Sequence, residues 1–296
     1  MASLSINEIT DSTWYIPGPV NIGICIEDDG AVVIDSGNDK EAGRQICKLL
    51  RERNLEIKGI CNTHSNADHI GGNDFIKKKT GCWTAAAPLE SAFITEPLLE
   101  TSLLWGGYPF PEIQNKFMKA KSSSVEYLIP EEGPVPNTCL KAFHLPGHFI
   151  QMVGFRTVDD IIFLADSLFS EEILRKYHLV YIYDIEAFYG TIERLLGFQG
   201  ALFIPSHSKP AEDIRGLAEK NKRKVDEIAL LIEEFCSSAL PWEEVLRRVC
   251  GHYGITLDYN QYVLLGSTVR SYLAFLGKKG TVKPILKDNT LLWHRQ

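Results

Sequence analysis

The residues best suited to chemistry lie together in residues 63–72, which read Thr-His-Ser-Asn-Ala-Asp-His-Ile-Gly-Gly. The apolar residues 57–62 before them predict a buried strand, and residues 74–79 after them predict a helix. The turn between these elements carries two imidazoles, an amide and a carboxylate: His64, Asn66, Asp68 and His69. Because imidazole favours zinc and iron and a carboxylate adds negative charge, this spacing indicates donors for a pair of metal ions. The plainer interpretation is a solvated polar turn in which Asp68 caps the helix.

Three later segments place the same kinds of side chain at the end of an apolar strand. The tetrapeptides Leu-Pro-Gly-His, Leu-Ala-Asp-Ser and Ile-Pro-Ser-His carry His148, Asp166 and His207. If the strands share one polarity, these turns meet the turn of residues 63–72 at one edge of a sheet. A further histidine, His144, lies inside its strand, and we expect it to have a structural role.

A strand near the start of the chain also ends in a carboxylate. Residues 28–30 predict a hairpin turn, and the apolar strand that follows ends in Ile-Asp-Ser-Gly, which contains Asp35. Asp35 could accept a hydrogen bond from a metal-binding histidine and orient its ring. The alternative is that Asp35 only caps or shapes a turn.

Residues 63–72 resemble the H-x-H-x-D-H signature of the metallo-β-lactamase superfamily, with Asn66 at the position of the second histidine. The segment around Asp35 resembles an earlier motif of that family. Its later motifs are matched by the segments that carry His148, Asp166 and His207. The resemblance implies an α/β fold, the metallo-β-lactamase αββα sandwich, over residues 1–209.

The same resemblance assigns metal ligands in this chain. They fall into three sets: His64, Asn66 and His148 for one ion, Asp68, His69 and His207 for the other, and Asp166 as the bridge. It implies one or two Zn²⁺ ions, with iron or manganese as alternatives. A metal-bound hydroxide would then attack a carbonyl carbon or a phosphorus atom.

Asparagine in place of histidine at position 66 affects the metal binding that we expect at the first site. A carbonyl oxygen of Asn66 is a weaker zinc ligand than imidazole, so we expect a weakened first site; otherwise Asn66 only forms hydrogen bonds. If the first site is empty, Asp68 could act as the catalytic proton acceptor. The residues Tyr181, Tyr183 and Tyr189 are candidates to donate a hydrogen bond to substrate.

Residues 210–296 predict a separate domain of three helices and a hairpin. This order resembles the winged-helix-like tail of some hydrolases of the same superfamily. The third predicted helix, residues 259–276, contains Arg270 as its one basic residue, whereas a DNA-reading helix needs several phosphate or base contacts. We therefore expect the tail to pack, shape the pocket or form a dimer rather than bind DNA.

Residues 103–111, Leu-Leu-Trp-Gly-Gly-Tyr-Pro-Phe-Pro, combine apolar surface with glycine and proline. We expect an irregular loop, either a lid over the pocket or a segment packed on the body or at a dimer contact.

Composition and charge limit the classes of partner and the cellular location that we expect for this protein. Residues 1–208 carry a net charge of −10 and the remainder +3, which disfavours a nucleic-acid backbone as ligand. There is no apolar run of membrane-spanning length, and residues 1–8 lack the basic and apolar regions of a secretory signal. Seven scattered cysteines without a C-x-x-C pair indicate free thiols in a reducing cytoplasm.

These observations predict a metal-dependent hydrolase that cleaves an ester, thioester or amide-type bond of a small molecule. Three alternatives remain at this point. They are a phosphodiesterase or ribonuclease of the same fold, a di-iron redox protein, and a binding module whose centre Asn66 has silenced.

Overall fold

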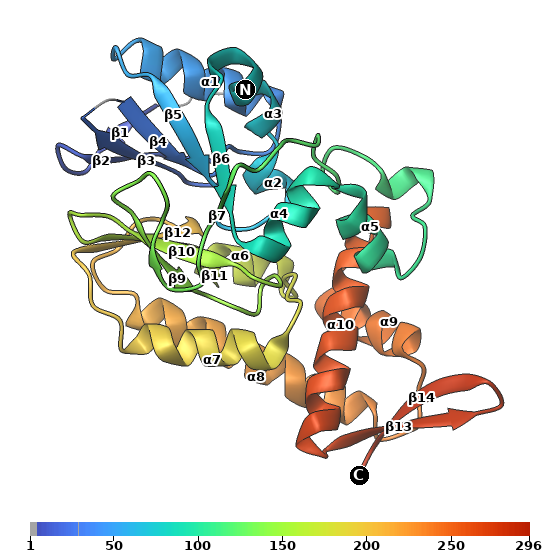
Figure 1. Ribbon diagram of the computed structural model, residues 1–296. Coiled ribbons are helices and arrows are strands. Elements are labelled where there is room, and N and C mark those ends of the chain that lie inside the picture. The colour runs from blue at the N-terminus through green and yellow to red at the C-terminus, as the bar shows by residue number, and fades with distance from the viewer. Residues whose placement is uncertain (1–4, 29) are drawn as a thin grey trace.

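Two sheets stacked face to face, with helices on both outer faces, form the body of the chain. The computed structural model describes residues 5–28 and 30–296. α1 (Lys40–Arg51) and α3 (Asn73–Thr80) cover the first sheet, and α7 (Ile185–Leu196) and α8 (Arg215–Phe235) cover the second (Figure 1). The αββα sandwich predicted from the sequence is confirmed. The predicted turn at residues 28–30 includes Asp29, which lies outside the described residues.

The first sheet follows chain order: β1 (Asn7–Glu8), β2 (Thr13–Ile16), β3 (Ile22–Glu27), β4 (Gly30–Ile34), β5 (Ile57–Cys61), β6 (Trp83–Ala86) and β7 (Tyr127–Leu128). The contacts of β4 show why the strands of this sheet are apolar on both faces. Val32 and Ile34 point into the core between the sheets, whereas Ala31 and Val33 pack in the core that contains Ile46 of α1. β4, β5 and β6 run parallel, so the turn after β5 opens at one end of the sheet.

The second sheet has the order β12 (Leu202–His207), β11 (Ile161–Phe169), β10 (Val153–Arg156), β9 (Lys141–His144) and β8 (Gly133–Pro134). β11 is longer than predicted. Its pairing with the parallel β12 shifts register on either side of Ala165, whose φ is 49°. Asp166 therefore lies within a distorted strand, not in a turn after one. The irregularity lets β11 continue while it redirects this side chain.

Short helices lie in connections between strands of one sheet: α2 (Ala67–Ile70), α4 (Pro88–Thr95), α5 (Leu98–Trp105) and the 3₁₀ turn η1 (Pro111–Ile113) in the first sheet, and α6 (Glu171–Tyr177) in the second. The prediction of an irregular loop over residues 103–111 is wrong at its start, because α5 ends only at Gly106, where φ is 81°. Leu104 is buried with residues of η1 and α10, which stabilises this last turn. Sequence reasoning began the segment in the middle of a helix.

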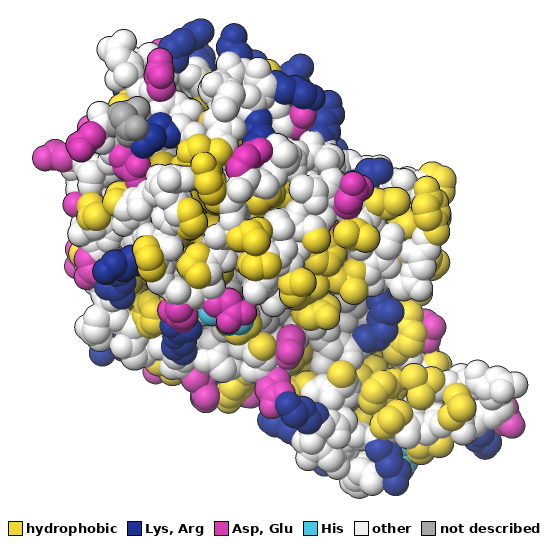
Figure 2. Space-filling view, viewed as in Figure 1, with side chains coloured by type: hydrophobic (Ala, Val, Ile, Leu, Met, Phe, Trp, Pro, Cys, Tyr) yellow, Lys and Arg dark blue, Asp and Glu magenta, His cyan; other side chains and the backbone are white. Residues whose placement is uncertain are grey.

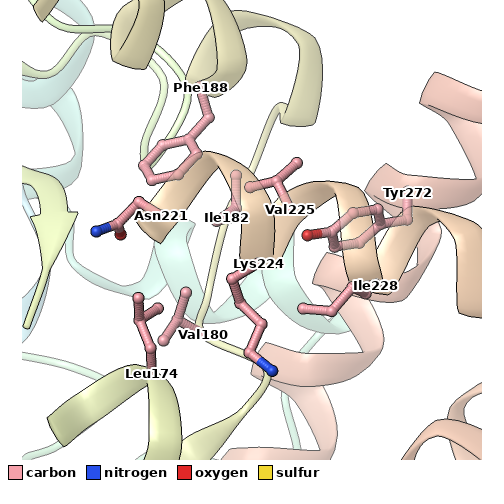
Figure 3. Close-up of a pocket in the computed structure, with 9 residues that line it drawn as sticks. All are labelled: Leu174, Val180, Ile182, Phe188, Asn221, Lys224, Val225, Ile228 and Tyr272. Carbon is pink, nitrogen blue, oxygen red and sulfur yellow. The ribbon is translucent and has the colours of Figure 1, made fainter. Parts of the chain in front are cut away.

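The C-terminal part contains α8, α9 (Trp242–Tyr253), α10 (Tyr259–Lys279) and a hairpin of β13 (Val282–Lys287) and β14 (Thr290–Arg295). Its core is continuous with the core beneath the second sheet. A cavity of about 10 Å³ at this junction lies between α7, α8 and α10, with room for about one water molecule (Figure 3). The helices and hairpin are as predicted, and the domain boundary at residues 209–210 stays a prediction. Within the described ranges, no helix is both long and apolar enough to cross a membrane.

Candidate metal centre

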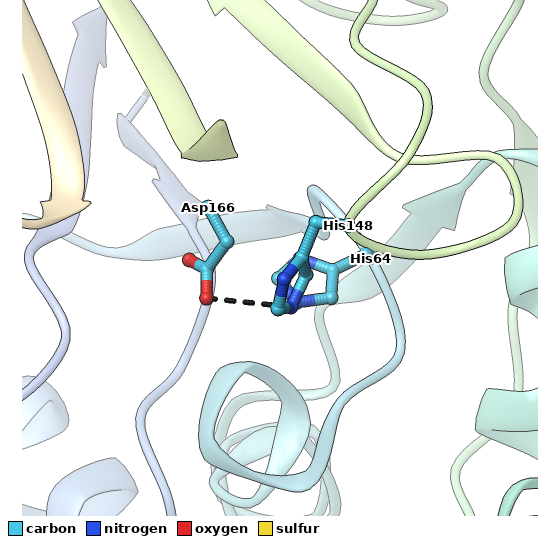
Figure 4. Close-up of side chains that lie close together, drawn as sticks. All are labelled: His64, His148 and Asp166. Atoms are coloured by element: carbon cyan, nitrogen blue, oxygen red, sulfur yellow. Dashed lines mark ion pairs between the residues drawn. The ribbon is translucent and has the colours of Figure 1, made fainter. Parts of the chain in front are cut away.

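The predicted site residues come from four places in the fold. Within the described residues they form two groups that could each hold a metal ion: His64, His148 and Asp166, and Asp68, His69 and His207. In each group the possible ligand atoms lie within 4.8 Å of one another. The first group lies between the turn after β5, the turn after β9 and the bulged part of β11 (Figure 4). His144 belongs to neither group and pairs within β9 opposite Val153.

Asp166 lies between the two groups. Its Oδ2 is 3.0 Å from Nε2 of His207 and 3.5 Å from Nε2 of His148, the ion pair drawn in Figure 4. Its Oδ1 is 3.2 Å from Nε2 of His69. Asp68 approaches from the open side, with Oδ2 3.6 Å from His207 Nε2. One carboxylate therefore contacts histidines of both groups, as a bridging ligand must.

Each histidine is held by its second ring nitrogen, and this sets which nitrogen faces the centre. The Thr63 hydroxyl donates to Oδ2 of Asp35 (2.8 Å), so its oxygen can only accept a hydrogen bond from Nδ1 of His64 (3.0 Å). Nδ1 of His69 donates to the same carboxylate oxygen of Asp35 (2.8 Å). Asp35 thus orients His69 directly and His64 through Thr63, which supports the first of its two predicted roles.

The other two imidazoles are anchored by backbone carbonyls. Nδ1 of His148 lies 3.0 Å from the carbonyl of Tyr181, and Nδ1 of His207 lies 2.7 Å from the carbonyl of Pro19. A carbonyl oxygen only accepts, so in both rings Nδ1 carries the proton. In their neutral forms both rings present the Nε2 lone pair to the centre, which is the arrangement of metal-binding histidines.

The environment of the His64 ring shows that these residues fit a metal ion. Its Nε2 is buried and has no hydrogen-bond partner among the described residues. Burial lowers the pKa of His64 well below its ordinary value, and the neighbouring His69 lowers it further, so the ring is neutral. A buried lone pair without a donor is costly, and a cation would satisfy it. Imidazole nitrogens together with carboxylate oxygens suit zinc or iron.

Opposite charges in the centre stabilise each other's ionised form. Burial raises the pKa of Asp166, but His207 and His69 outweigh it and hold the pKa well below the ordinary value. Burial lowers the pKa of His207, but Asp166 outweighs that effect and raises it to about 9. In the absence of a cation, protons take its place beside these carboxylates. Metal ions would therefore compete with protons for this site.

Asn66 lies beside the first group. Its Oδ1 is 2.9 Å from Nε2 of His148, and its Nδ2 donates to Oε1 of Glu100 (2.7 Å). Glu100 comes from α5 and is only 7% exposed; burial raises its pKa well above the ordinary value. Sequence reasoning missed Glu100, because nothing in the sequence of α5 marks one acidic residue as facing a site 34 residues earlier.

A second buried carboxylate that sequence reasoning missed supports the two ligand loops. Glu90 on α4 accepts the backbone N–H of Ser65 at Oε2 (2.9 Å) and that of Gln151 at Oε1 (2.8 Å). Ser65 follows His64, and Gln151 lies three residues after His148. Burial raises the pKa of Glu90 to about 7. Glu90 therefore fixes the distance between the two loops that supply the first group.

The centre opens into a cavity of about 1270 Å³. Asp68 lines it with a side chain that is 45% exposed. Of the three candidate tyrosines only Tyr181 lines it, and the Tyr181 hydroxyl is buried without a hydrogen-bond partner in the described part of the chain. The predicted lid, residues 103–111, is not part of the lining. Glu100, Phe117 and Met118 line that side instead.

The chain is 25% identical over 156 residues to hydroxyacylglutathione hydrolase of Pelagibacter ubique (strain HTCC1062). The match covers 49% of this chain and 54% of that protein, so it spans about half the length of this curated relative.

Two solved structures are similar over nearly the whole chain. A beta-lactamase domain protein from Burkholderia ambifaria has a TM-score of 0.73 at 13% identity, over 99% of this chain and 94% of that one. A metallo-beta-lactamase family protein from Thermus thermophilus has a TM-score of 0.72 at 17% identity, over 99% of both chains. At these identities the likeness is one of fold. A family model described as Metallo-beta-lactamase superfamily matches residues 15–207, which include both metal groups, and the chain belongs to that superfamily.

Proposed function

We propose that this protein hydrolyses a thioester of a small, partly apolar molecule, with related esters and amides as weaker substrates. The observation that carries the proposal is the pair of His/Asp groups that share Asp166 at the floor of a large cavity. The thioester is placed first because the relative from Pelagibacter ubique is named a hydroxyacylglutathione hydrolase.

The residues around the centre have distinct roles in this proposal. One or two metal ions, zinc first among them and iron or manganese as alternatives, would lower the pKa of a bound water toward about 7 and polarise the carbonyl group. His64, His148, Asp68, His69, His207 and the bridging Asp166 would hold them, with Asn66 beside the first group. If the first group holds no ion, Asp68, half-exposed in the cavity, can instead accept the proton of the attacking water. Tyr181, which lines the cavity, is the candidate among the three tyrosines to donate a hydrogen bond to the substrate.

The far wall of the cavity supports a substrate with an apolar arm. It is formed by residues of the C-terminal part, among them Ile255, Leu264 and Leu265. The tail, with the helix and hairpin order of a winged-helix-like domain, then shapes the pocket. α10 packs against α5, α7, α8 and α9, and the Arg270 guanidinium lies 4.9 Å from the Trp242 ring and donates to the Leu104 carbonyl (3.0 Å). A helix held in this way is poorly placed to enter a DNA groove.

A substrate panel tests the reaction. Chelator-treated protein, reloaded with Zn²⁺, Mn²⁺ or Fe²⁺, is assayed on a hydroxyacylglutathione, an acyl thioester without glutathione, an aryl ester, an amide, a phosphodiester and RNA. We expect thioester turnover that chelation abolishes and metal restores. Asp166→Asn should lower kcat/KM by about 100-fold or more. Asp159→Asn, in a hydroxyl cluster away from the centre, should leave it unchanged.

Other results identify the alternatives. Cleavage of the phosphodiester or RNA alone would replace the proposal by a phosphodiesterase. Iron in the purified protein with no hydrolysis would favour the redox protein, and a protein that binds no metal would be a binding module.

Two further proposals concern the surroundings of the molecule. Hydrophobic side chains gather over the region of α4 and α5 (Figure 2), and Trp105 and the 78%-exposed Tyr108 could meet a second copy in a homodimer, which light scattering would detect.

Cytoplasmic location is supported by the cysteines, all seven of which are unpaired. Fractionation of the native host would test it.

A further inference from the structure

We propose that Glu100 is a positioning residue that holds the Asn66 amide with its carbonyl oxygen toward His148, so that this oxygen completes the first metal group. The inference rests on the proposed two-metal centre and extends it to a residue of α5. In this reading the Asn66–Glu100 pair does together what the second histidine of the family signature does alone.

The contact between Asn66 and His148 calls for a cation. Nδ1 of His148 donates to the Tyr181 carbonyl, so the neutral ring presents a lone pair at Nε2. The atom 2.9 Å away is Oδ1 of Asn66, which is also an acceptor. Two acceptors at this distance repel each other unless a positive charge lies beside both.

Glu100 decides which end of the amide faces the centre. The Asn66 amide can turn by half a revolution with little change of shape, exchanging its oxygen for its nitrogen. Nδ2 donates to Oε1 of Glu100 at 2.7 Å, so Oε1 is the acceptor in this contact. The turned amide would place Oδ1 against the carboxylate and an N–H against His148, which would block the metal position. The hydrogen bond to Glu100 therefore selects the ligating orientation.

The place of Glu100 favours this role over a purely structural one. It is 7% exposed, and the Asn66 amide is the hydrogen-bond partner that the described residues give its carboxylate. It lies in the first turn of α5, where its carboxylate bonds to the Asn66 amide and makes no capping hydrogen bond, and it also lines the cavity. A buried carboxylate is costly, so a helix that only needed packing would be served better by an apolar side chain.

Zn²⁺ titration of chelator-treated full-length protein tests the inference, with binding measured calorimetrically. The wild type should bind two ions, and His207→Ala should remove one of the two phases and so identify the second group. Glu100→Leu should weaken the first group about 10- to 100-fold and leave the second within threefold. The matched control is Thr101→Val, which alters the neighbouring buried residue of α5 and should change neither phase.

The decisive comparison repeats Glu100→Leu in an Asn66→His background. A histidine at position 66 ligates through its own ring and has no amide to orient, so Glu100→Leu should now change the first affinity less than threefold. Equal losses in both backgrounds would show that Glu100 only supports the fold and would overturn the inference. No loss in either background would overturn it as well.

Two further results keep this inference separate from the proposed function. If the wild type binds one Zn²⁺ per chain, in the phase that His207→Ala removes, Asn66 does not bind metal and the inference is overturned. The proposed hydrolysis would then be carried out at the second group. No Zn²⁺ in any variant would overturn the proposed function itself. If circular dichroism shows that Glu100→Leu is unfolded, Glu100→Met gives the same comparison with a flexible side chain of similar length; it offers no oxygen to the Asn66 amide, and a loss of about threefold or more is expected only with Asn66 present.

Discussion

Replacing Asp35 by asparagine should separate orientation of the metal ligands from stability of the fold. Asp35 is buried, and its two oxygens accept from His69 Nδ1, the Thr63 hydroxyl and the Thr63 backbone N–H, each at 2.8 Å. Its φ is 61°, a left-handed conformation that asparagine tolerates as well as aspartate does. The substitution therefore changes charge and hydrogen bonding while the backbone is spared.

The magnitude follows from the contacts. An amide at position 35 offers one acceptor oxygen and one NH₂ donor, so the donor must face either His69 Nδ1–H or Thr63. If it faces His69, the ring moves its proton to Nε2 and loses the lone pair that faces Asp166. Loss of such a supporting carboxylate weakens metal binding about 10- to 100-fold, or about 1.4 to 2.8 kcal/mol. A buried donor left unpaired costs about 1 to 3 kcal/mol of folding stability.

The assay compares Zn²⁺ affinity with urea unfolding of the chelator-treated protein. We expect the Zn²⁺ affinity of the group of Asp68, His69 and His207 to fall more than that of the group of His64. Asp35 contacts His69 directly, whereas it is linked to His64 only through the Thr63 hydroxyl. Asp159→Asn is the matched control, since Asp159 also accepts from three hydroxyls but lies away from the centre. Lowered stability with Zn²⁺ affinity unchanged within threefold would refute the reasoning and leave Asp35 as a turn residue.

Three other outcomes follow from the geometry. Asn66→His should raise Zn²⁺ affinity at the first group about tenfold or more, because imidazole is the stronger ligand; unchanged affinity would contradict this. Leu264→Trp should lower kcat/KM for long-chain acyl thioesters about tenfold while short ones are spared, and equal losses for both would count against the cavity as the acyl site. Burial raises the pKa of Glu90 from 4.5 to about 7, so the folded chain holds a proton that the unfolded chain releases between these values. As pH rises through that window, chelator-treated wild type should lose up to about 3 kcal/mol relative to Glu90→Gln in urea unfolding; a constant difference would contradict this.

The sequence predicted the parts of the site that follow from local pattern. A strand ends where its apolar run ends, so the turns that carry His64 and His148 were placed correctly, as was His207 at the last residue of β12. Asp166 was predicted after a strand and lies inside one. A register shift depends on the partner strand, and no residue near Ala165 announces it.

The parts that the sequence did not predict depend on contacts between distant segments. Glu90 bonds to residues 25 positions before it and 61 positions after it, and Glu100 bonds 34 positions back. An acidic residue on a short helix is ordinarily a solvated one, so composition alone gives no reason to select either. The helical conformation of residues 103–105 was missed for a related reason, because it is stabilised by the packing of Leu104 against η1 and α10.

The candidate metal ligands and the apolar wall of the cavity come from different parts of the chain, which has a consequence for substrate selectivity. All candidate ligands and their supports lie before residue 208, whereas Ile255, Leu264 and Leu265 of the far wall lie some fifty residues later. Substitutions in that wall change the shape of the cavity and leave every candidate ligand in the sequence. Residues 253–265 are accordingly the segment in which a mutational library is expected to alter substrate selectivity.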